Sequence, residues 1–167
     1  MDSGLLLLRV IIGPLMAAHG SQKLFGWFGG YGLAGTSGFF ETIGFRPGRL
    51  FATLASGAEL VSGLLIATGL AGPIGPALMI SVMIVAAMSV HLPNGVFAQN
   101  NGIEVPLLYG VAGAALALTG PGRFSLDALL GLTALSAPEL AWAALGVGIL
   151  GGMVNVALRH APATAKA

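Results

Sequence analysis

Residues 49–73, RLFATLASGAELVSGLLIATGLAGP, decide the fold of this chain. The part from Arg49 to Leu70 is mostly apolar, and Glu59 is its only internal charge. It is long enough to cross a bilayer, for which an α-helix needs about 20 predominantly apolar residues. A short Ala-Gly-Pro turn then leads into a second apolar run, Pro73–His91. The pattern therefore predicts two antiparallel membrane helices.

The composition of the whole chain agrees with a membrane protein. Of its 167 residues 56% are hydrophobic and only 8% are charged, and the mean hydropathy is +0.91. Soluble domains carry about 25% charged residues, so this chain has too few charges to cover a surface that faces water. The net charge of +1 argues against a nucleic-acid partner. The absence of cysteine excludes disulfides, thiolate metal sites and cysteine nucleophiles.

Three further apolar runs complete the predicted fold. They are Ser3–Leu24, Glu104–Thr119 and Pro138–Leu158. We expect an all-α integral membrane bundle, with four of the five predicted helices in residues 1–128. An interfacial segment and a fifth transmembrane helix follow in residues 129–158, and residues 159–167 form a polar tail. The first run contains Arg9 and has no basic segment before it, which predicts a retained helix and not a cleaved signal peptide.

The connections between these runs are predicted to lie at the membrane surface. Residues 25–48 are rich in glycine and aromatic side chains, which are typical of the membrane–water boundary, and Phe39, Phe40 and Ile43 fit one face of a short interfacial helix. Within residues 126–137 we expect a second short helix, with Ser125 as its N-cap.

Charges inside a membrane helix cost several kcal/mol unless they are paired or hydrated. Glu59 lies near the middle of its helix, and its neighbours at helical spacing are small, so it is predicted to face protein. Arg9 lies deep in the first helix, at the membrane face that also holds Asp127. We therefore predict a structural ion pair between Arg9 and Asp127, with Glu59 as the competing partner.

Four polar side chains are predicted to meet at the opposite face. His19 and Lys23 share a helix face because they are four residues apart. His91 ends one helix and Glu104 begins the next at the same level. With Glu59 deeper, they would form a pocket for a quinone or another polar ligand. Two alternatives stay open, because a lysine near a helix end often snorkels to the interface and a histidine often caps a helix. No local spacing favours a metal site.

Several of these residues also carry a resemblance to a family. They are Arg9 with Gly13, His19-Gly20, the Lys23-Leu-Phe-Gly run, Gly35-Thr-Ser-Gly-Phe-Phe, the Glu59-Leu-Val-Ser-Gly-Leu run, Ala86 with His91, Glu104 and the run from Gly120 to Asp127. In this order they resemble the DoxX family of small bacterial membrane proteins, which includes the small subunit of a thiosulfate:quinone oxidoreductase. The resemblance implies a four-helix membrane core and an association with membrane redox complexes, and it makes His19, Lys23, Glu59, His91, Glu104, Arg9 and Asp127 the motif positions.

From this combination we expect an accessory subunit of a quinone-linked respiratory or dehydrogenase complex. We expect it to contact membrane lipids and other subunits, to carry no covalently bound cofactor, and not to catalyse redox chemistry alone. The alternatives are a small proton-coupled transporter that uses Glu59 and a purely structural scaffold. The resemblance implies a location in the bacterial inner membrane, and the distribution of Lys and Arg predicts that the N-terminus lies outside and the C-terminus in the cytoplasm.

Overall fold

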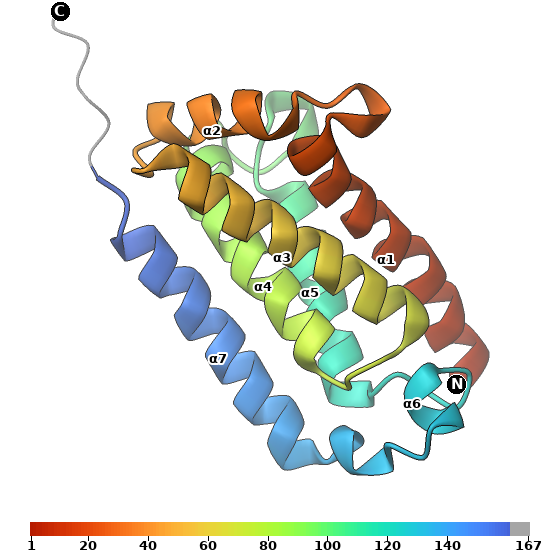
Figure 1. Cartoon of the computed structure of the whole chain (residues 1–167). Helices are drawn as coiled ribbons and strands as arrows, with labels where there is room; N and C mark the ends of the chain where they lie inside the picture. Colours follow the sequence, from red (N-terminus) through yellow and green to blue (C-terminus); the bar gives the residue numbers. More distant parts are fainter. Residues whose placement is uncertain (161–167) are drawn as a thin grey trace, which may run out of the picture.

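The computed structural model describes residues 1–160 and is a bundle of long helices (Figure 1). These helices are α1 (Asp2–Phe25), α3 (Gly48–Thr68), α4 (Ile74–Ala86), α5 (Glu104–Thr119) and α7 (Pro138–Ala157). The described residues contain no strand, so the predicted all-α class is confirmed. Four helical segments, α1, α3, residues 74–94 and α7, are long and apolar enough to cross a membrane, and α5 with 16 residues is shorter.

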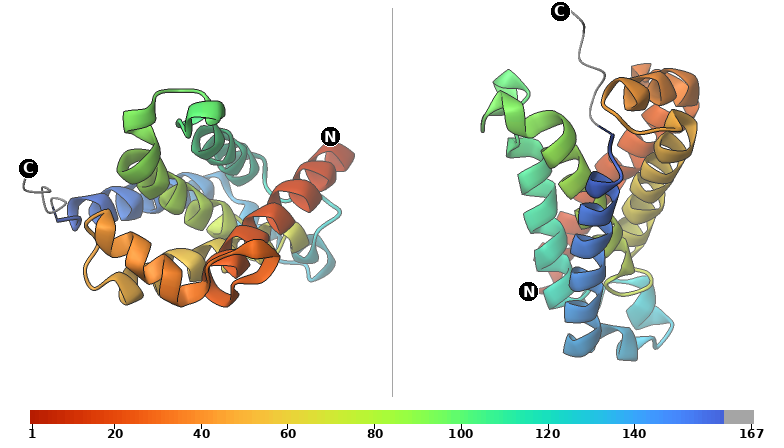
Figure 2. Two further views of the ribbon diagram at one scale, coloured as in Figure 1. Left: turned by 90° about the horizontal axis from the view of Figure 1, so that it is seen from above. Right: turned by 90° about the vertical axis from the view of Figure 1, so that its left-hand side faces the viewer.

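Short elements close the two ends of the bundle. The helix α2 (Gly32–Thr42) lies across the ends of α1 and α3, as the view from above in Figure 2 shows. At the other end are α6 (Leu126–Leu129) and the 3₁₀ turn η5 (Thr133–Ser136). The Ser125 hydroxyl accepts a hydrogen bond of 3.2 Å from the Ala128 amide, which confirms the predicted N-cap.

The end of α4 differs from the sequence prediction. We expected an α-helix as far as His91, but residues Ala87–His91 form a π-helix, η2, which leads into the 3₁₀ turn η3 (Leu92–Asn94). A second 3₁₀ turn, η4 (Ala98–Asn100), follows before α5. The Ser89 hydroxyl in η2 is buried and has no hydrogen-bond partner in the described residues. The wider helical turn carries the local backbone out of the regular hydrogen-bond pattern, which sequence periodicity does not reveal.

The α1–α3 pair is packed through small residues. A β-carbon added to Gly20 would lie 2.6 Å from both the Ser56 carbonyl oxygen and the Leu60 amide nitrogen of α3. A β-carbon on Gly13 would lie 2.7 Å from the carbonyl oxygen of Gly63. The two backbones are thus in direct contact, which is how membrane helices associate without a hydrophobic driving force between them.

A single methyl group at this contact is expected to destabilise the bundle. Gly20→Ala should lower the free energy of unfolding by about 1–3 kcal/mol, because only a shift of the α3 backbone can relieve the clash. Gly57→Ala on α3 is the matched control, since a β-carbon there meets no atom within 4 Å. It should be neutral or stabilising by up to about 1 kcal/mol, as alanine favours helix. Equal unfolding of the two variants in mixed micelles would show that the α1–α3 contact is looser than described.

The last helix, α7, packs along α4 (Figures 1 and 2). A β-carbon on Gly148 would lie 2.6 Å from the Ala77 carbonyl oxygen, and one on Gly152 would lie 2.8 Å from that of Ser81. The fifth predicted transmembrane helix is therefore packed directly against a helix of residues 1–128. This contact uses the small residues Gly148 and Gly152 of α7.

The C-terminal end of α7 is tied to the turn between α2 and α3. The Arg159 guanidinium donates a hydrogen bond to the Ile43 carbonyl, and the His160 amide donates one of 2.9 Å to the Gly44 carbonyl. These two residues, which we predicted to begin a solvated tail, are therefore anchored to the bundle. The remainder of that predicted tail, residues 161–167, lies outside the described residues.

Candidate functional site

Glu59 is buried inside the bundle, as its small neighbours predicted. It is only 2% exposed, and Ser56 and Ser62 beside it on α3 are fully buried. The Ser56 hydroxyl donates to the Ala52 carbonyl at 2.6 Å, and the Ser62 hydroxyl donates to the Gly75 carbonyl of α4 at 2.7 Å. These hydroxyls are thus satisfied by backbone groups, so the carboxylate needs another partner.

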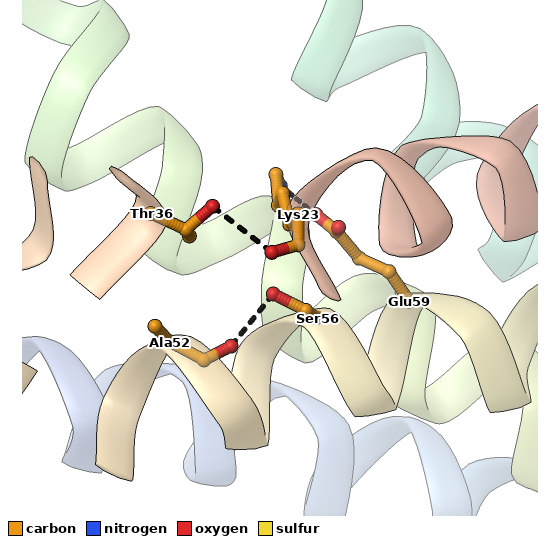
Figure 3. A network of polar contacts seen from close by, with 5 residues as sticks. All are labelled: Lys23, Thr36, Ala52, Ser56 and Glu59. Atoms are coloured by element: carbon orange, nitrogen blue, oxygen red, sulfur yellow. Dashed lines mark hydrogen bonds and ion pairs between the residues drawn. The ribbon is translucent and has the colours of Figure 1, made fainter. Parts of the chain in front are cut away.

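Lys23 supplies that partner by an ion pair with Glu59 (Figure 3). Lys23 lies in the last turn of α1, and its ammonium bonds the Oε1 atom of Glu59 on α3. The Lys23 carbonyl accepts a hydrogen bond of 3.1 Å from the Thr36 hydroxyl of α2, so the helix that covers this end also fixes the backbone of the lysine. The lysine side chain therefore reaches inward to the carboxylate instead of snorkelling outward.

The ion pair leaves half of the carboxylate unpaired. The Oε2 atom of Glu59 is buried and has no hydrogen-bond partner among the described residues. The side chain of Lys23, by contrast, is 36% exposed. A buried polar atom without a partner costs roughly 1–3 kcal/mol, and more when it is charged. The site therefore has unused hydrogen-bonding capacity on its buried side and access on its lysine side.

His19 and Tyr109 stand near this ion pair. The His19 ring is exposed on α1, and it meets the Tyr109 ring of α5 edge to face, with ring centroids 6.1 Å apart and an angle of 80° between the planes. Tyr109 is half-buried against the core, and it is close enough to Glu59 for the charge of the carboxylate to act on the phenol. Sequence reasoning missed Tyr109, although a phenol in an apolar membrane helix was a usable signal.

His91 and Glu104 make their polar contacts elsewhere. The Nδ1 atom of His91 is 2.8 Å from the Asn101 carbonyl oxygen, and Glu104 accepts a hydrogen bond of 2.8 Å from the Ala98 amide. Both contacts hold the loop between α4 and α5. In residues 1–160 no hydrogen bond or ion pair joins either side chain to His19, Lys23 or Glu59, and no three acidic or histidine side chains are grouped as a metal site requires. Direct polar contacts therefore do not create the predicted five-residue pocket.

Arg9 and Asp127 are both buried at the opposite end, but they do not form the direct ion pair that we predicted. Arg9 donates to the carbonyl groups of Ile66 at 3.1 Å and of Phe124 at 2.9 Å, and also to Pro121. Asp127 instead accepts the backbone amides of residues 71 and 72, at 2.9 and 2.7 Å. Within the described residues no salt bridge joins the two side chains. The reason is that helix ends and turns offer backbone groups without partners, and these satisfy both charges.

Comparisons with known proteins agree with this architecture. The family model DoxX matches residues 4–92, which is more than half of the chain. A protein of Bacillus subtilis (strain 168), named "Putative oxidoreductase CatD", is 35% identical over 126 residues, which cover 75% of this chain and 86% of that protein. No solved structure is significantly similar to the chain. The matched region holds α1 to η2, with Arg9, His19, Lys23, Glu59 and His91, and the chain is therefore a multi-pass membrane protein of the DoxX family.

Proposed function

We propose that this protein is an accessory subunit of a quinone-linked redox complex in the bacterial cytoplasmic membrane. The observation that supports this most is the half-satisfied carboxylate of Glu59, paired with the partly exposed Lys23 inside an apolar bundle. A quinone dissolves in the bilayer and carries carbonyl oxygens on a planar ring. A quinone can therefore reach a polar site that lies inside the membrane.

The side chains around the ion pair have complementary roles toward such a ring. The Lys23 ammonium has donors beyond the one that it gives to Glu59, and one of them can bond a quinone carbonyl oxygen. Histidine exchanges protons near neutral pH, so the exposed His19 can pass the protons that accompany quinone reduction. Tyr109 supports the His19 ring. With no cysteine in the chain to hold an iron–sulfur cluster, the electrons would come from a partner subunit.

The test is purification of the tagged full-length chain from its native membranes in mild detergent, with mass spectrometry of bound proteins and an assay of quinone-dependent turnover. We expect a dehydrogenase or oxidase to co-purify. His19→Ala should assemble normally but lower turnover at least about tenfold, because it removes a proton-transfer group. His160→Ala is the control, since the His160 side chain is exposed and only its backbone bonds the bundle.

Two outcomes would contradict the proposal. Absence of any redox partner from the purified material, with no loss of turnover in His19→Ala, would favour the structural scaffold. Substrate flux in proteoliposomes that contain this chain alone would favour the transporter. The 2% exposure of Glu59 and its ion pair with Lys23 offer no support for the transporter, since a proton-coupled transporter needs a carboxylate that reaches solvent on both sides.

We also propose that the N-terminus lies outside and the C-terminus in the cytoplasm. The α2 end of the bundle carries Lys23, Arg46, Arg49 and Arg159, whereas Arg123, paired with Asp2 at 3.7 Å, lies at the opposite end. Short loops rich in Lys and Arg stay on the cytoplasmic side. A reporter fused after Ala167 should therefore be active only in the cytoplasm, and periplasmic activity would reverse the orientation.

A further inference from the structure

A separate cavity lies between α2, α3, α4 and the last turns of α7, and its volume is about 260 Å³. One wall consists of three phenylalanine rings, Phe40, Phe45 and Phe51, whose successive centroids are 5.6 and 5.2 Å apart. The same cavity is also lined by two polar side chains, Ser81 of α4 and Asn155 of α7. A mostly apolar and aromatic lining with a few polar groups is typical of a small-molecule site.

Both polar side chains have unused hydrogen-bonding capacity. Asn155 donates from Nδ2 to the Gly151 carbonyl at 2.8 Å, which leaves its Oδ1 acceptor without a partner in the described residues. Ser81 makes no hydrogen bond there at all, whereas the helical hydroxyls of Ser56 and Thr119 bond the carbonyl four residues earlier. A β-carbon on Gly151 would lie 3.4 Å from the Ser81 hydroxyl oxygen, so this hydroxyl faces the same turn of α7 as Asn155.

We propose that this cavity binds the ring of a quinol, an aromatic ring that carries hydroxyl donors. The rings of Phe40 and Phe45 would contact the face or edge of the ligand ring. Its hydroxyl groups would donate to Oδ1 of Asn155 and exchange a hydrogen bond with Ser81. An apolar cavity of about 150 Å³ is known to hold benzene, so about 260 Å³ admits one substituted ring. A lipid acyl chain would fill the space but would leave both polar groups unpaired, which is costly in an apolar setting.

The quinol cavity is distinct from the site around Glu59, because the Glu59 carboxylate turns toward Lys23 on α1 and lines no part of it. It also assigns a role to α7. That helix brings Asn155 to the cavity, and its end is held in place by the bonds from Arg159 and His160 to the α2–α3 turn. The choice of a quinol as the ligand rests on the proposed quinone-linked function. The cavity and its unpaired polar groups are observed independently of that proposal.

Equilibrium dialysis of the chain in nanodiscs tests the proposal. Empty nanodiscs are the reference, because they measure how much probe partitions into the lipid. The probes are a tail-less benzoquinol, kept reduced, and 1,4-dimethoxybenzene, which has the same ring without donors. We expect the quinol to bind at least about fivefold more tightly than the dimethoxy compound, the ratio for the loss of one hydrogen bond. Asn155→Leu, which keeps the side-chain size, should abolish that preference, and Ser81→Ala should reduce it.

A substitution that fills the cavity provides an independent test. Ala55→Phe places a ring in the cavity and should prevent binding of both probes, whereas Ala115→Phe, on the exposed face of α5, should leave binding unchanged. Equal binding of the two probes, or wild-type affinity in Asn155→Leu, would overturn the proposal and point to acyl-chain occupancy. If Ala55→Phe does not fold, Asn155→Leu and Ser81→Ala still decide whether the cavity recognises the quinol hydroxyl groups. Failure here leaves partner co-purification and the His19→Ala turnover unaffected, so the two proposals fail separately.

Discussion

Lys23→Ala is expected to destabilise the protein by about 3–5 kcal/mol, the usual cost of removing one partner from a buried ion pair. The reason is that Glu59 is 2% exposed and bonds no other group, so the variant leaves a carboxylate inside the bundle with neither oxygen satisfied. Chemical unfolding in mixed micelles, followed by circular dichroism, measures the loss.

The combination Lys23→Met with Glu59→Leu is the control for this prediction. It removes both charges together, so it should unfold at a higher denaturant concentration than Lys23→Ala, because no charge is left uncompensated. If the double variant folds stably but loses quinone-dependent turnover, the pair serves function beyond stability. A Lys23→Ala protein as stable as the wild type would show that water, not the lysine, satisfies Glu59.

Arg9→Ala is expected to have a comparably large effect, a loss of about 3–5 kcal/mol and a sharp fall in folded yield, since each buried group left without its partner costs roughly 1–3 kcal/mol. Arg9 is only 3% exposed. From α1 it bonds the Ile66 carbonyl in the last turn of α3 and the Phe124 carbonyl in the segment before α6, so it joins three parts of the chain. Its removal leaves several buried carbonyl groups without their donor, each of which carries a desolvation cost. Thermal unfolding in detergent and the yield of monodisperse protein report the loss.

Arg9→Lys separates the charge from the geometry. Lysine keeps the charge but cannot reproduce the planar set of donors that reaches several carbonyl groups at once, so it should recover only part of the stability. In a double-mutant cycle with Asp127→Asn, the coupling should be smaller than the 3–5 kcal/mol of a direct buried pair, because both side chains bond backbone groups. A stable Arg9→Ala protein would refute the role of Arg9 as the link between α1, α3 and residues 121–124.

The positions of the long helices were predictable because each depends on local information. An apolar run of sufficient length must form a helix in lipid, since no other open structure satisfies its backbone there. The bounds of α5 agree with the prediction, and those of α1, α3 and α7 differ by one or two residues. The η2 π-helix was not predictable, because its wider turn leaves the hydrophobic pattern of residues 87–91 unchanged.

The candidate site was predictable only in part. Small neighbours at helical spacing predicted that Glu59 faces protein, and the cost of a buried charge required a partner, but several cations were available in the sequence. The partner of Glu59 depends on how far α1 slides along α3, which the contacts at Gly13 and Gly20 set. Tyr109 and Asn155 were overlooked as site residues because nothing in the sequence near them indicates which helix they face.

The amino-acid sequence alone therefore predicts a helical membrane bundle, the positions of its long helices, and the few charges that must find partners inside it. Those partners are visible only in the packed bundle. They are Lys23 for Glu59, backbone carbonyls for Arg9, backbone amides for Asp127, and the loop before α5 for His91 and Glu104. The physical reason is that the cost of burying a charge is a property of the residue and its segment. The group that offsets this cost comes from another helix, and its distance is set by packing along the whole bundle.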